Sequence, residues 1–236
     1  MKKSHIVMLL TFLLLIPATI YFGLRFSGRA YYVTSTLVMI ETLVPFLLAF
    51  ENRKPQAREL VVLAVMCALA VAGRVAIPIP SFKAIFGIIM IAGIAFGPES
   101  GFLVGAISAL ASNFFYSQGP YTPWQMMAYG AGGVLAGFVF AEGRLPRKPV
   151  VMGIFGFLAV AFFVGPLLDT CSVFLVMSRI TLKGAMAFYI SGFPVNLRQA
   201  VATAIVLLVL GKPLLEKLDR IKTKYGILDD EGRKEA

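Results

Sequence analysis

The sequence is poor in the residues that carry most catalytic and metal-binding chemistry. It has one histidine, His5 near the N-terminus, and two cysteines, Cys67 and Cys171, which form no close-spaced pair. With so few cysteines and histidines, the sequence argues against a disulfide framework, a thiolate metal site, haem or zinc ligation and histidine-based catalysis. Nucleotide-binding G-x-x-x-x-G-K-[ST] and hydrolase H-E-x-x-H or G-x-S-x-G patterns do not occur. We therefore expect no catalytic residues, no metal and no cofactor, and hence no enzyme.

Charge is also scarce, at 14% of residues, whereas hydrophobic residues reach 58% and the mean hydropathy is +0.84. Soluble domains of this size do not carry so many apolar runs of spanning length. The net charge of +10 comes from residues between and after those runs, where membrane topology places them, so nucleic acid is not an expected partner. The composition predicts an all-α integral membrane protein lying in a lipid bilayer.

The apolar runs predict eight membrane spans in three parts. A two-helix extension occupies residues 1–58, a six-helix core residues 59–211, and a charged tail residues 212–236. The runs cover 5–24, 30–50, 59–77, 84–96, 101–116, 124–141, 150–168 and 194–210. With both termini in the cytoplasm most basic residues lie on the cytoplasmic side, as the positive-inside rule requires. The polar stretches 77–83, 117–125 and 169–193 then lie outside and face one another.

Those outer stretches hold the amides, aromatics and charges that the spans lack, which is how small-ligand sites in apolar bodies are built. The candidate substrate-binding residues are Lys83, Asn113, Tyr121, Trp124, Gln125, Asp169, Asn196, Arg198 and Gln199. The alternative is an interfacial belt of aromatic residues and snorkelling cations. Glu41 lies deep in the second run, and its role stays open.

Four alanines recur every fourth residue in the run 59–77, namely Ala64, Ala68, Ala72 and Ala76. On a helix this spacing makes one stripe of small side chains that lets another helix approach closely. The spacing alone favours packing within the protein and docking of a partner protein equally.

Three segments resemble the substrate-binding (S) component of energy-coupling factor (ECF) transporters, the vitamin importers of prokaryotes. They are the alanine stripe, the stretch 82–126, and GFPVNLRQAV with the following GKPLLEKLDRIKTKYG. The resemblance implies a six-helix vitamin-binding subunit of the prokaryotic plasma membrane, without ATPase activity. It implies docking through the alanine stripe on a transmembrane coupling (T) subunit that carries two cytoplasmic ATPases. The central stretch is most similar to cobalamin-type members.

Other readings stay open. One is that the substrate is another vitamin or a queuosine precursor. A second is that the protein is an intramembrane enzyme acting on lipid, and a third is that it is a scaffold that uses only its small-residue faces. The enzyme would need clustered acidic residues or histidine, and the scaffold would not need the outer amides and aromatics.

Overall fold

The computed structural model describes residues 15, 18–19, 30–52, 55–177 and 179–227. The described elements are all helical, with no strand among them. The expected first span, 5–24, lies outside these residues except at positions 15, 18 and 19.

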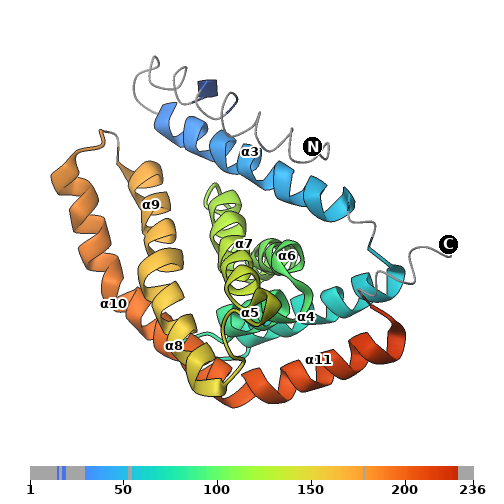
Figure 1. The fold of residues 1–236 in the computed structure, drawn as a ribbon. Helices are drawn as coiled ribbons and strands as arrows, with labels where there is room; N and C mark the ends of the chain where they lie inside the picture. The colour runs from blue at the N-terminus through green and yellow to red at the C-terminus, as the bar shows by residue number, and fades with distance from the viewer. Residues whose placement is uncertain (1–14, 16–17, 20–29, 53–54, 178, 228–236) are drawn as a thin grey trace.

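The helices follow one another with short connections (Figure 1). They are α3 (Ala30–Asn52), α4 (Ala57–Val75), α5 (Ile85–Phe96), α6 (Pro98–Tyr116), α7 (Thr122–Val139), the short turn η2 (Ala141–Gly143), α8 (Pro149–Ala159), the π-helical turn η3 (Val160–Val164), α9 (Gly165–Val176), α10 (Leu182–Val206), the π-helical turn η4 (Leu207–Gly211) and α11 (Lys212–Tyr225). α8, η3 and α9 form one continuous rod, whereas α10, η4 and α11 follow one another without a break but bend at η4. From α4 to η4 the described chain forms six successive helical segments.

Two of the described helices are long and apolar enough to cross a membrane, Pro149–Val176 and Leu182–Tyr225. The first contains the predicted run 150–168, and the second contains the predicted run 194–210. The prediction of eight spans is not confirmed by this criterion.

The prediction of an outer loop over residues 169–193 is wrong. α9 continues to Val176, and α10 begins at Leu182, where the Thr181 side chain accepts a hydrogen bond from the Gly184 N–H. The polar residues in this stretch suggested a loop, but several of them pair across the two helices. The Asn196 amide, for example, donates to the Asp169 carboxylate at 2.7 Å. Polar composition here reflects a polar helix–helix contact.

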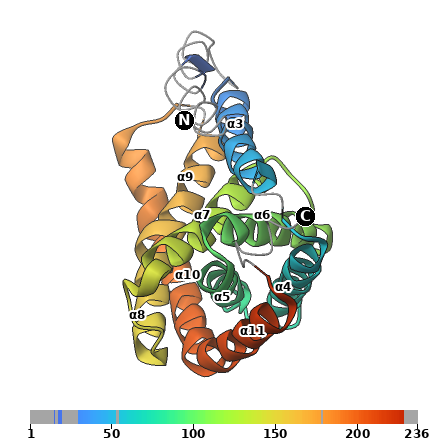
Figure 2. The same cartoon turned by 45° about the vertical axis from the view of Figure 1, so that its right-hand side comes forward.

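α5 is the central helix of the bundle, and all twelve of its residues are buried. It packs against α4, α6, α7, α10 and α11, which surround it in Figure 2. Its length of about 18 Å is shorter than a hydrocarbon core. Two cations bind the carbonyls at its C-terminal end, where the helix dipole favours positive charge: Arg147 donates to Ile94 O at 3.2 Å and Lys222 to Ala95 O at 2.7 Å.

Three glycines let α5, α6 and α7 touch backbone to backbone. A Cβ added at Gly101 would lie 2.6 Å from the carbonyl oxygen of Gly133 and 2.7 Å from the Cα of Gly93. No side chain fits at such a distance, so glycine is required for this contact. The contact fixes how the start of α6 lies beside the second half of α7.

We therefore expect Gly133→Ala to lower the stability of the detergent-solubilised protein by about 1–3 kcal/mol, because the added methyl group meets the Gly101 backbone. Thermal unfolding measures the change. Gly132→Ala is the matched control, since its methyl group would meet only the Val164 side chain at 3.2 Å and Met90 at 3.9 Å. Equal melting temperatures for the two variants would contradict the contact.

α3 packs against α6, α7 and α9. Its buried Leu43 contacts a small cluster that includes Phe102 and Ala106. Glu41, for which the sequence indicated no partner, accepts a hydrogen bond from Thr19 at 2.6 Å. This bond joins α3 to the segment that precedes it.

Candidate functional site

A hydrogen-bonded network begins at Arg74, in the last turn of α4. Its Nη1 donates to Ser112 and, at 2.9 Å, to Asn113 Oδ1, both on α6 and both fully buried. The guanidinium lies 4.9 Å from the ring centre of Tyr116 and 5.5 Å from that of Tyr129. Tyr116 also donates to the Arg74 carbonyl oxygen at 3.0 Å. Arg74 therefore binds α4 to the end of α6.

Asn113 extends this network to α7. Its Nδ2 donates to Gln125 Oε1 at 2.8 Å and to Thr122 Oγ1 at 3.2 Å. Thr122 donates in turn to Gln118 in the preceding loop at 2.9 Å. We call Arg74, Ser112, Asn113, Thr122 and Gln125 the Arg74 network. It joins the ends of three helices that are separate in the sequence.

The network carries a positive charge that no described carboxylate balances, because none lies within ion-pair distance of Arg74. Lys83 adds a second cation nearby, with Nζ 6.0 Å from the Tyr116 ring centre and donating to Ile77 O. Gln199 of α10 reaches the same loop and donates to Lys83 O at 2.7 Å. Lys83 and α10 therefore lie beside the Arg74 network.

Trp124 has a buried hydrogen-bond donor that is unpaired in the described structure. The residue is 5% exposed, and its ring stacks on Phe174 of α9 at 5.6 Å with an interplanar angle of 26°. Its indole Nε1 is buried and has no hydrogen-bond partner among the described residues. A buried donor without an acceptor costs about 1–3 kcal/mol, so this N–H calls for a specific explanation.

Asp169 and Asn196 form a separate pair between α9 and α10. Asp169 also lies against Gly192, where a Cβ would overlap the carboxylate. A second polar contact, between Thr170 and Tyr189 at 2.8 Å, joins the same two helices. Among the described residues, no hydrogen bond connects these pairs with the Arg74 network.

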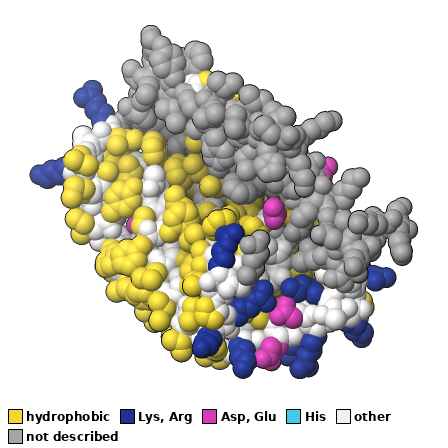
Figure 3. All heavy atoms as spheres, viewed as in Figure 1, with side chains coloured by type: hydrophobic (Ala, Val, Ile, Leu, Met, Phe, Trp, Pro, Cys, Tyr) yellow, Lys and Arg dark blue, Asp and Glu magenta, His cyan; other side chains and the backbone are white. Residues whose placement is uncertain are grey.

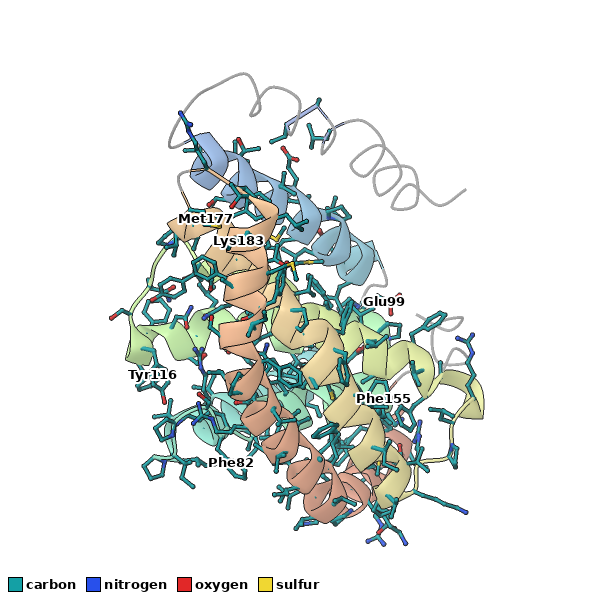
Figure 4. All side chains as sticks on the ribbon, turned by 90° about the vertical axis from the view of Figure 1, so that its left-hand side faces the viewer. Phe82, Glu99, Tyr116, Phe155, Met177 and Lys183 are labelled. Carbon is teal, nitrogen blue, oxygen red and sulfur yellow. The ribbon has the colours of Figure 1, made fainter. Side chains whose placement is uncertain are left out.

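The nine predicted substrate-binding residues thus fall into groups. Lys83, Asn113, Gln125 and Gln199 lie in or beside the Arg74 network, and Trp124 neighbours Gln125. Asp169 and Asn196 pair elsewhere, Tyr121 donates to Ser117 O within its own loop, and Arg198 is exposed. Figure 4 labels two residues next to these groups: Tyr116, which contacts Arg74, and Phe82, which precedes Lys83. Both lie toward the same side of the molecule as Met177 and Lys183, and Glu99 and Phe155 lie toward the other side.

Sequence reasoning missed Arg74, Ser112 and Thr122 as members of the site. Arg74 had a usable signal, since it is the only basic residue in the run 59–77. Ser112 and Thr122 had none, because their role depends on which side chains face them in space.

All four alanines of the stripe on α4 are exposed. The opposite face of the helix packs inward through Leu63, Met66, Cys67 and Ala70. The stripe is therefore not used for packing within the described structure, and its role as a docking face stays a prediction.

We expect Arg74→Met to lower the stability by about 1–3 kcal/mol, because Asn113 Oδ1 would stay buried without its donor. Thermal unfolding without added ligand measures this effect. The control is Arg179→Met, at an exposed position near the start of α10. If the two variants unfold at the same temperature, the network does not hold α4 to α6.

Comparison with known proteins identifies the class. The family model for the S component of the ECF-type riboflavin transporter matches residues 54–216, from just before α4 into α11. The match covers more than half of the chain, and the chain belongs to this family of ECF S components. Searches of curated proteins and of solved structures found no match.

The chain is therefore a membrane-embedded, substrate-binding subunit of a vitamin transporter and not an enzyme. S components associate with a T subunit, with ATPase subunits and with the membrane. The resemblance to ECF S components is confirmed, whereas the similarity to cobalamin-type members is not.

Proposed function

We propose that this S component binds a riboflavin-type vitamin, a planar ring with polar edges, where α4, α6 and α7 meet. The observation that carries the proposal is the buried, unpaired indole N–H of Trp124, one residue from Gln125 of the Arg74 network. The description of the matching family, a riboflavin transporter, supports the same substrate class.

The chemistry of the residues fits such a ring. A flavin presents carbonyl oxygens and ring nitrogens along one edge and apolar faces above and below. The indole N–H of Trp124 and the N–H groups of Arg74 other than Nη1 have no described acceptor and can donate to that edge. Tyr116, Tyr129 and Phe174 supply aromatic surface beside them. Lys83, Asp169, Asn196, Arg198, Gln199 and Tyr121 remain predicted contacts.

We expect Trp124→Phe to weaken riboflavin binding about 3- to 10-fold, because it removes one hydrogen-bond donor and keeps the aromatic stack on Phe174. Trp124→Ala should weaken binding further, since it removes the stack as well. Quenching of flavin fluorescence in detergent measures the affinity. Tyr225→Phe is the control and should bind as the unaltered protein does, because it removes a hydroxyl group beside the start of α4, whereas Arg74 lies in the last turn of that helix.

The same titration tests the cobalamin prediction. If cobalamin displaces bound flavin, or binds while flavin does not, the substrate is a corrinoid and the riboflavin proposal is wrong. If Trp124→Phe binds riboflavin with unchanged affinity, riboflavin is still the substrate but the Trp124 N–H does not contact it.

We propose that the exposed alanine stripe of α4 is the face that docks on the T subunit. Small side chains allow close approach of a second helix in lipid, and this face has no partner helix in the described structure. Arg74 lies at the end of the same helix, so α4 carries both the docking face and part of the ligand site.

Ala68→Leu combined with Ala72→Leu should abolish co-purification with the T and ATPase subunits and leave ligand affinity unchanged. The two leucines would hold a partner helix away from the α4 backbone. Ala187→Leu, at an exposed alanine of α10, is the control. If the double variant still co-purifies with the T and ATPase subunits, the alanine stripe is not the docking face.

A further inference from the structure

The last helix, α11, runs across one end of the bundle. It leaves α10 at an angle in both Figure 1 and Figure 2, after the π-helical turn η4 and at Pro213. Its apolar face is already occupied by the bundle, where Leu215 and Leu218 are 3% and 4% exposed. Lys222 fixes the same face to Ala95 O. α11 therefore has no apolar face left to insert into a bilayer.

The opposite face of α11 is basic. Lys217, Arg220 and Lys224 are exposed and lie three and four residues apart, so they form one stripe. No described carboxylate lies within ion-pair distance of these three side chains. The acidic residues of α11 are used elsewhere, since Glu216 pairs with Lys212 at 3.9 Å and Asp219 with Lys222 at 3.0 Å.

Apolar surface directly precedes this basic stripe. Leu208, Val209 and Leu210 of η4 are 43%, 64% and 44% exposed. On the neighbouring α8, Val150 and Ile154 are also exposed. Figure 3 shows the apolar side chains over a broad face and the Lys and Arg side chains gathered along its lower edge, where α11 runs in Figure 1. In a membrane protein such a border lies between the acyl chains and the headgroups.

We propose that the stripe of Lys217, Arg220 and Lys224 binds the headgroups of anionic phospholipids. Each juxtamembrane Lys or Arg raises the affinity of a protein for an anionic membrane surface about fivefold. Because the apolar face of α11 is buried in the bundle, this contact is electrostatic and requires no insertion of the helix. It therefore depends on headgroup charge and on ionic strength.

The test uses the full chain in detergent with equal amounts of phosphatidylglycerol and phosphatidylcholine, and native mass spectrometry counts the bound lipids. The unaltered protein should retain phosphatidylglycerol preferentially. Lys217→Gln with Arg220→Gln should lower that preference at least about fivefold. Arg179→Gln with Lys183→Gln, a matched pair of exposed cations near the start of α10, should leave it unchanged.

Equal preference in the two double variants would overturn the proposal. A salt titration of the unaltered protein is independent of folding defects in the variants, and the preference should fall as ammonium acetate rises from 0.1 to 1 M, because screening shortens the range of the charges. If the unaltered protein shows no lipid preference and Lys217→Gln with Arg220→Gln instead loses the ATPase or T subunit, the stripe contacts protein and the lipid proposal is wrong.

Discussion

The backbone contact of α5, α6 and α7 at Gly93, Gly101 and Gly133 is the constraint on which the rest of the structure depends. It lies at the C-terminal end of α5, near the start of α6 and in the second half of α7. At the other end of α6 and α7, Asn113 donates to both Thr122 and Gln125. The backbone contact also holds α5 at the centre, where the carbonyls at its C-terminal end bind cations from the following loop and from α11. The contact therefore fixes the end of α5 at which both cations bind.

The candidate site contains side chains that hydrogen-bond to one another and one hydrogen-bond donor that is unpaired in the described structure. Arg74, Ser112 and Asn113 are hydrogen-bonded among themselves, which fixes their positions before any ligand arrives. Trp124 is held by its stack on Phe174, yet its N–H has no described acceptor. Preorganised surroundings with one unpaired donor are compatible with the ligand site that we propose.

The sequence predicted the parts of this architecture that depend on local pattern. The runs 84–96 and 101–116 correspond closely to α5 and α6. Residues 169–193 were misassigned because Asp169 and Asn196 satisfy each other across two helices, which no single-helix pattern reveals. Arg74 was missed for a related reason, since its acceptors lie almost forty residues further along the chain.

The π-helical turn η4 sets which way α11 faces. A π turn holds one more residue than an α-helical turn, and each residue in a helix rotates the following side chains by about 100°. The extra residue between Leu207 and Gly211 therefore decides that Leu215 and Leu218 meet the bundle while Lys217 and Arg220 point away from it. The direction in which the side chains of α11 point therefore depends on the number of residues in η4. A deletion or insertion of one residue there would turn the basic face of α11 toward a different side.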